Sequence, residues 1–121
     1  MRRWLVTALL GLTWLPCIGQ AQEYKPRFDV KAPAIVAEGR ALFNRRCAGR
    51  CHGLDGFEGF DGPILFGRTY LEPTYVWATL STGRPGSAMP SWKGRLSDDD
   101  LWKIIAFVSS LGDQARAARA K

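Results

Sequence analysis

The clearest alternation of hydrophobic and polar positions lies near the C-terminal end of the chain. Four apolar residues follow the i, i+3, i+4, i+7 spacing of one helix face: Leu101, Ile104, Ile105 and Val108. Ser97 precedes them as an N-cap, and the aspartates at 98–100 occupy the first turn, where the helix dipole favours negative charge. The pattern predicts a helix that begins after Ser97 and ends at Gly112, followed by a polar, alanine-rich tail over 113–121.

Two earlier stretches also have helical spacing. Pro33 suits the first turn of a helix, and the apolar residues of 34–46 recur on one face around Gly39. Glycine in a helix interior costs about 1 kcal/mol relative to alanine. We interpret Gly39 as the point where another helix approaches closely, with an exposed, merely tolerated glycine as the alternative. A further helix is predicted to begin at Pro73 and to end before Gly83.

The segments between these helices are rich in glycine and proline and are predicted to be irregular. They are an extended N-terminal arm over 22–33, a loop over 53–63 and a strap over 83–92. Several large apolar side chains in or just after the loop are candidates to cover one side of a cofactor: Phe57, Phe60, Ile64, Leu65 and Phe66.

The first 21 residues have the pattern of a secretory signal peptide. Arg2 and Arg3 form a short positive start, an apolar run over 5–15 follows, and small residues precede a cleavage point after Ala21. We therefore expect export to the periplasm, with no membrane span in the mature chain. An uncleaved N-terminal anchor is the alternative.

Length and charge restrict the remaining choices. A chain of 121 residues accommodates one domain, which we place at 34–112. Without the leader, 15 Lys and Arg face 11 Asp and Glu, for a formal charge of +4. No basic stripe with interleaved aromatic residues is present, which argues against nucleic-acid binding. A domain of this size buries only a modest core, so a large apolar cofactor would add missing contacts.

The sequence from Cys47 to His52 carries the candidate chemistry. Two cysteines followed directly by a histidine are typical of covalent haem attachment, although three residues separate the cysteines here instead of the usual two. Gly49 supplies backbone freedom for the extra residue. The cysteine pair is also compatible with a disulfide. A zinc site is less consistent with the sequence, because no third cysteine or second histidine is present outside the leader.

Four further residues complete the predicted site. The second nitrogen of the His52 ring needs an acceptor, which a backbone carbonyl near Pro63 would provide. Met89 is the one methionine outside the leader and sits on the irregular strap, so it is the best remaining soft ligand for iron. Arg84 and Trp92 are predicted to donate hydrogen bonds to haem propionates.

Taken in order, these residues resemble a class I c-type cytochrome of the small bacterial periplasmic kind. The resemblance covers 34–111 and rests on the helix with Gly39 and Phe43, the Cys47–His52 motif, the strap with Met89, and the aromatic-bearing last helix. It implies an all-α cytochrome c fold, with three to five short helices wrapped around one covalently attached haem. It also implies that the first and last helices cross where Gly39 and Phe43 meet Ile104 and Phe107.

The resulting functional hypothesis is a monomeric electron carrier and not an enzyme. Iron with two strong axial ligands, His52 and Met89, has no open position for substrate. Redox proteins, such as a dehydrogenase donor and a cytochrome or oxidase acceptor, are the expected partners. The alternatives are a haem-based sensor or small haem enzyme in which Met89 leaves the iron, and a haem-free disulfide protein.

Overall fold

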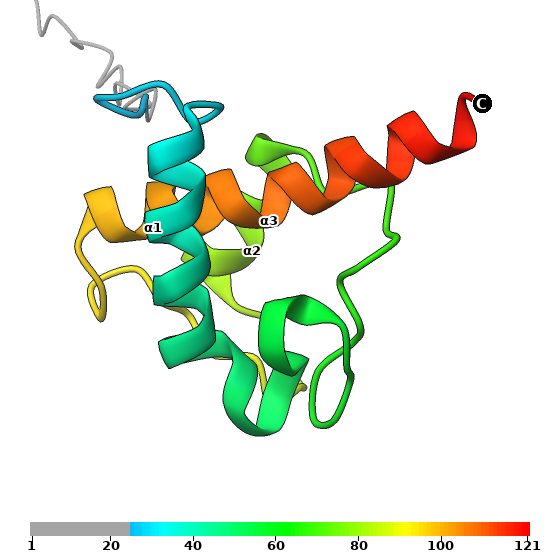
Figure 1. The fold of residues 1–121 in the computed structure, drawn as a ribbon. Coiled ribbons are helices and arrows are strands. Elements are labelled where there is room, and N and C mark those ends of the chain that lie inside the picture. Colours follow the sequence, from blue (N-terminus) through cyan, green and yellow to red (C-terminus); the bar gives the residue numbers. More distant parts are fainter. Residues whose placement is uncertain (1–24) are drawn as a thin grey trace, which may run out of the picture.

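The computed structural model describes residues 25–121 and is built from helices (Figure 1). The three α-helices are α1 (Pro33–Phe43), α2 (Pro73–Thr82) and α3 (Asp98–Arg119). A wide π-helical segment, η1 (Asn44–His52), continues from α1, and a short 3-10 turn, η2 (Leu54–Gly56), follows it. The described residues contain no strand beyond one isolated bridge between Lys93 and Leu96, which confirms the all-α prediction. The predicted signal peptide lies outside the described residues.

The core forms where α1 crosses α3 (Figure 1). At Gly39 the two backbones approach so closely that an added Cβ would lie 1.8 Å from the Lys103 carbonyl oxygen and 3.1 Å from the Phe107 Cβ. The Phe43 and Phe107 rings pack with their centroids 5.2 Å apart, and Ile104 is almost fully buried. The predicted close approach at Gly39 is therefore confirmed, and its nearest contact is the Lys103 backbone.

Helix α2 packs on α3 through a pair of aromatic rings. Trp77 and Trp102 stack with their centroids 5.2 Å apart and their planes nearly parallel. The helix begins at Pro73 and ends at Thr82, as predicted, and Gly83 follows it with a φ of 65°. The predicted cap of α3 is also present, because the Ser97 hydroxyl accepts a hydrogen bond from the Asp100 amide at 3.1 Å. None of the helices described is both long enough and apolar enough to cross a membrane.

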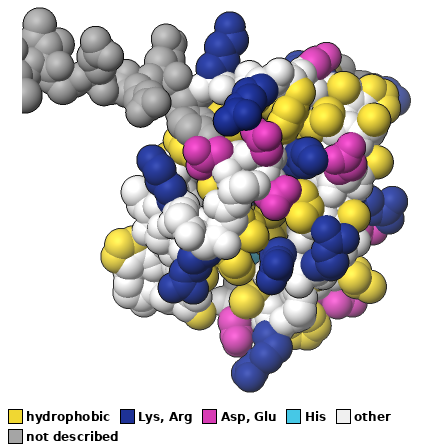
Figure 2. Space-filling view, turned by 90° about the vertical axis from the view of Figure 1, so that its left-hand side faces the viewer, with side chains coloured by type: hydrophobic (Ala, Val, Ile, Leu, Met, Phe, Trp, Pro, Cys, Tyr) yellow, Lys and Arg dark blue, Asp and Glu magenta, His cyan; other side chains and the backbone are white. Residues whose placement is uncertain are grey.

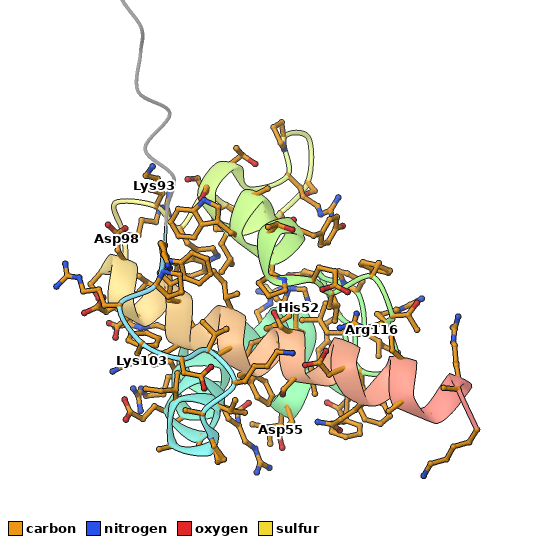
Figure 3. The ribbon with its side chains drawn as sticks, turned by 90° about the horizontal axis from the view of Figure 1, so that it is seen from above. His52, Asp55, Lys93, Asp98, Lys103 and Arg116 are labelled. Atoms are coloured by element: carbon orange, nitrogen blue, oxygen red, sulfur yellow. The ribbon has the colours of Figure 1, made fainter. Side chains whose placement is uncertain are left out.

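The prediction that the last helix ends at Gly112 and leaves a polar tail over 113–121 is wrong. Helix α3 continues to Arg119, and Ala115 is buried. Gly112 lies against the segment before α2, where an added Cβ would be 2.7 Å from the Leu71 carbonyl oxygen. Arg116, in the C-terminal half of α3 (Figure 3), donates to the Thr69 carbonyl at 2.5 Å and pairs with Glu72 at 2.9 Å. Gly112 is thus a contact residue within the helix, and tertiary contacts order the segment beyond it.

The first helix also ends earlier than its sequence pattern predicts. The α-helical hydrogen bonding of α1 ends at Phe43, three residues before Arg46, and the chain widens into η1. Within η1, Gly49 leaves helical geometry altogether, with φ 10° and ψ −120°. This change begins just before the cysteine pair, so the motif is on a distorted turn and not on a regular helix.

Candidate functional site

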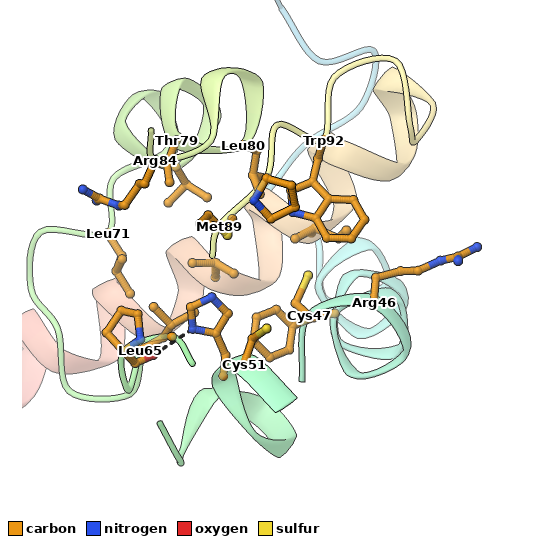
Figure 4. Close-up of a pocket in the computed structure, with 18 of the residues that line it drawn as sticks. Arg46, Cys47, Cys51, Leu65, Leu71, Thr79, Leu80, Arg84, Met89 and Trp92 are labelled. Atoms are coloured by element: carbon orange, nitrogen blue, oxygen red, sulfur yellow. Dashed lines mark hydrogen bonds between the residues drawn. The ribbon is translucent and has the colours of Figure 1, made fainter. Parts of the chain in front are cut away.

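All seven predicted site residues line a single pocket between α2, α3, η1 and the strap (Figure 4). They are Cys47, Cys51, His52, Pro63, Arg84, Met89 and Trp92. The rest of the wall is mainly apolar and comes from the three α-helices and from the segment before α2: Phe43, Leu65, Leu71, Val76, Leu80, Ile104 and Val108. In Figure 4, Arg84 and Leu71 lie at the opposite end of the pocket from Cys47 and Arg46. The pocket thus has a thiol end and an arginine end.

The thiol end is shaped by the widened turn of η1. The Gly53 amide donates to the Ala48 carbonyl at 3.0 Å, five residues back along the chain. Such a turn takes in one more residue than an α-helical turn. Cys47 is buried and Cys51 is partly exposed, and both thiols are free. Burial, and then the charge of Cys51, raises the pKa of the Cys47 thiol to about 12, so this thiol is protonated at neutral pH.

His52 is buried and held in one orientation. Its Nδ1 lies 2.8 Å from the Pro63 carbonyl oxygen, which is the contact that the sequence predicted. Because a carbonyl only accepts hydrogen bonds, Nδ1 carries a proton, which leaves Nε2 as the nitrogen that can bind a metal. Gly62 lies close to the ring, because an added Cβ there would be 2.8 Å from Cε1. His52 is therefore held in one orientation, with Nε2 as the nitrogen available to a metal.

Met89 is positioned by the strap that follows α2. The Arg84 amide donates to the Met89 carbonyl at 3.0 Å, and the Ser87 hydroxyl accepts from the Met89 amide at 3.2 Å. An added Cβ at Gly83 would lie 2.8 Å from the Met89 carbonyl oxygen, so the strap lies tightly against the end of α2. These contacts hold the thioether of Met89 in the pocket wall.

Two hydrogen-bond donors with different surroundings also line the pocket. The Trp92 Nε1 is buried and has no hydrogen-bond partner among the described residues. Arg84 donates to the Tyr75 hydroxyl, and its guanidinium carbon lies 5.7 Å from the centre of the Tyr75 ring. A buried N–H without an acceptor is costly, and an acidic group bound in the pocket would satisfy it.

The predictions from the sequence omitted some residues that line the pocket and assigned others to it wrongly. Gly62 and Tyr75 line the pocket, and no sequence pattern singles them out. Of the five apolar residues predicted to cover a cofactor, Leu65 alone is among the lining residues. Phe57 and Phe66 instead stack on each other at 4.2 Å, and both are about half exposed, as are Phe60 and Ile64. That prediction is wrong for these four side chains, because the loop turns them outward.

The pocket residues fit a covalently bound haem. The thiols can form two thioether bonds, His52 and Met89 are the axial ligand types of electron-transfer cytochromes, and the walls are apolar. The unpartnered Trp92 Nε1 suits a propionate. Within 25–121, no group of three or more His, Cys, Asp or Glu side chains is arranged to hold a metal ion, so the zinc alternative has no ligand set there.

Comparisons with known proteins give the same chemistry. The family model described as cytochrome C oxidase, cbb3-type, subunit III matches residues 34–108. The chain is 34% identical over 85 residues to the cbb3-type cytochrome c oxidase subunit FixP of Rhizobium meliloti (strain 1021), covering 66% of this chain and 29% of that protein. It is 34% identical over 84 residues to subunit CcoP of Cereibacter sphaeroides, covering 65% of this chain and 28% of that protein.

The chain thus spans less than a third of the length of these relatives. No solved structure gave a significant match. The family match covers more than half of the chain and includes the cysteine pair, His52 and Met89. The chain therefore belongs to the family of cytochrome C oxidase, cbb3-type, subunit III, as a c-type cytochrome domain that carries covalently bound haem c and has an electron-transfer role.

Proposed function

We propose that the protein is a periplasmic, monomeric electron carrier with one haem, attached through Cys47 and Cys51 and ligated by His52 and Met89. The observation that carries the proposal is the meeting of two free thiols, an oriented imidazole and a thioether in one mainly apolar pocket. The haem supplies an iron that gains and loses a single electron. The chain supplies the environment in which this exchange is reversible.

Each protein group has a separate role in that environment. The Pro63 carbonyl keeps the His52 proton on Nδ1 and increases the basicity of the ring. The contacts of the strap with α2 hold Met89 in place, and a rigid ligand reduces the rearrangement between oxidation states. Two strong ligands leave no open position on the iron, which favours electron transfer over substrate chemistry. Arg84 and Trp92 are the donors proposed for the propionates.

The proposed partners are redox proteins, with a dehydrogenase as donor and a cytochrome or oxidase as acceptor. Both relatives are named as oxidase subunits, which supports an oxidase as one partner. Arg46 lines the pocket beside the thiols, and Arg45 and Arg50 are exposed nearby. Figure 2 shows Lys and Arg side chains interspersed with apolar ones over one face of the molecule. Such a mixture suits a small contact with an acidic partner.

The test is the optical spectrum of the purified haem protein and of Met89→Ala. The wild type is expected to show the near-red sulfur-to-iron band when oxidised, and Met89→Ala is expected to lose it. Pro85→Ala, at an exposed position of the same strap that does not line the pocket, is the control and should retain the band. A wild type without this band, or a band that survives Met89→Ala, would overturn the assignment of Met89.

A second measurement separates the carrier from the sensor or enzyme alternative. Carbon monoxide is added to the reduced protein, and binding is followed in the visible spectrum. A carrier whose two axial ligands stay bound should not react in the wild type, whereas Met89→Ala should bind carbon monoxide readily. Rapid binding to the wild type would favour a protein in which Met89 is displaced by a ligand.

A further inference from the structure

The extra residue in the Cys47–Cys51 spacing lies next to a loop that controls His52. The three residues between the cysteines are Ala48, Gly49 and Arg50, where the usual motif has two. Without this extra residue, the carbonyl before Cys51 would be that of Gly49, whose φ of 10° and ψ of −120° are not helical. The groups that follow Gly49 are the carbonyls of Arg50 and Cys51, and both accept hydrogen bonds from outside η1.

Three consecutive amides of the loop after η2 donate to these two carbonyls. The Asp61 amide donates to the Arg50 carbonyl at 3.0 Å. The Phe60 and Gly62 amides donate to the Cys51 carbonyl at 3.0 Å and 3.2 Å. The loop therefore has its tip anchored to the end of the haem-attachment motif, and one of its three anchors is the carbonyl of Arg50.

Gly62 and the residue that follows it, Pro63, contact the imidazole of His52. Gly62 lies so close to the ring that an added Cβ would be 2.8 Å from Cε1 and 3.0 Å from Nδ1. Pro63 follows at once, and its carbonyl accepts from Nδ1 at 2.8 Å. A shift of the loop tip by a few tenths of an ångström would therefore alter both the stacking on the ring and the length of this hydrogen bond.

We propose that Arg50 is a positioning residue: through its carbonyl it anchors the 60–63 loop on His52 and thereby sets the strength of the Pro63 hydrogen bond. The Arg50 side chain is not needed, because its Nε lies 3.8 Å from the Asp61 carboxylate and is largely exposed. Exposed pairs of this kind contribute little. The proposal rests on the proposed function in one respect, namely that His52 is a ligand of the iron.

The chemical consequence concerns the reduction potential. A hydrogen bond from Nδ1 to a carbonyl makes the imidazole a stronger donor, which stabilises the oxidised iron. When the anchor is lost, the hydrogen bond weakens and the oxidised state loses part of that stabilisation. The midpoint potential should then rise, with both axial ligands still bound.

The main experiment deletes Arg50 in the haem-loaded protein, which restores a two-residue spacing. We expect a higher midpoint potential and roughly tenfold faster hydrogen exchange at the Asp61 amide, which is the scale of one lost hydrogen bond. The matched control is Arg50→Ala, which retains the spacing and the carbonyl. It should leave both the potential and the exchange rate unchanged.

A second variant keeps the proposal testable if the deletion prevents haem attachment. Gly62→Ala presses a methyl group onto the His52 ring and should raise the potential while retaining the near-red band. Gly67→Ala, at a loop glycine with no neighbour within 4 Å of its added Cβ, is the control for this variant.

Either of two results would overturn the proposal. One is an unchanged or lower potential in the Arg50 deletion, or in Gly62→Ala if the deletion does not attach haem. The other is an Arg50→Ala protein that shifts the potential as much as the deletion, because the side chain would then be responsible. A wild type without a haem spectrum would instead refute the proposed function, and this is known before any variant is measured.

Discussion

The two sides of this molecule are held together differently. Where α1 crosses α3, helix backbones touch at Gly39 and the space around them is filled by Phe43, Ile104 and Phe107. On the other side, helices and irregular segments together form the pocket around the two thiols, His52 and Met89. Side chains of the chain itself fill the space at the helix crossing. The space in the pocket is filled by the haem.

The difference shows in the buried polar groups. At the crossing, apolar side chains and helix backbone are in contact, and the one ion pair described between α1 and α3 has a satisfied partner on each side, with Lys103 Nζ 2.7 Å from the Glu38 carboxylate. In the pocket, the Trp92 Nε1 is buried without a partner and the Cys47 thiol is held protonated by burial. A buried N–H without an acceptor is costly, and a bound acidic group would satisfy the Trp92 Nε1. The pocket side therefore depends on its cofactor far more than the crossing does.

The largest expected effect comes from removing the cofactor's covalent attachment. Cys47→Ser combined with Cys51→Ser should abolish cooperative thermal unfolding, because a chain of this size has little other core. The measurement is circular dichroism against temperature, with limited proteolysis. Cleavage should begin in the loop and strap segments and not in α1 or α3. A cooperative transition in this variant would show that the pocket side folds stably without covalently attached haem.

A smaller effect is expected from disturbing the crossing alone. Gly39→Ala places a methyl group into the Lys103 backbone and should lower the free energy of unfolding by about 3 kcal/mol, with the haem still attached. Denaturant unfolding monitored at the haem measures this. Ala37→Leu, on an exposed position of the same helix, should change stability by less than about 0.5 kcal/mol. Equal effects at both positions would contradict a close contact at Gly39.

The smallest expected effect lies where the two sides join. Asp55, in the turn after His52, accepts hydrogen bonds from Arg40 and Asn44, and its own amide donates to Asn44 at 2.9 Å. The Arg40 and then the Asn44 hydrogen bonds lower the pKa of Asp55 to about 2. Because this folded-state pKa is below the unfolded one, the stabilisation is complete above about pH 4 and is lost as pH falls through 2.

Melting temperatures across that acid range test this link. Asp55→Asn should flatten the dependence of the melting temperature on pH between about pH 4 and pH 2. Asp61→Asn, whose carboxylate is half exposed and 3.8 Å from Arg50 Nε, is the control and should keep the wild-type dependence. An Asp55→Asn protein that loses stability towards acid as steeply as the wild type would exclude this carboxylate as the cause.

The sequence by itself determined the parts of the protein that depend on local order. Helical spacing and caps predicted α2 correctly from Pro73 to Thr82, and Ser97 marked the start of α3. The Cys47–His52 motif and Met89, the one methionine besides Met1, indicated residues that line the pocket, because haem attachment requires those residue types. A glycine on an apolar helix face also indicated the helix crossing.

The tertiary structure alone decided features that depend on contacts distant in the sequence. Gly112 has the local pattern of a helix end, yet its contact with Leu71 and the Arg116 hydrogen bonds keep α3 helical to Arg119. Phe57 and Phe66 are as apolar as the pocket walls, and the direction of the loop alone turns them outward. Local pattern gives the preference of a segment for a conformation, whereas the neighbour that each side chain meets is set by how the segments pack.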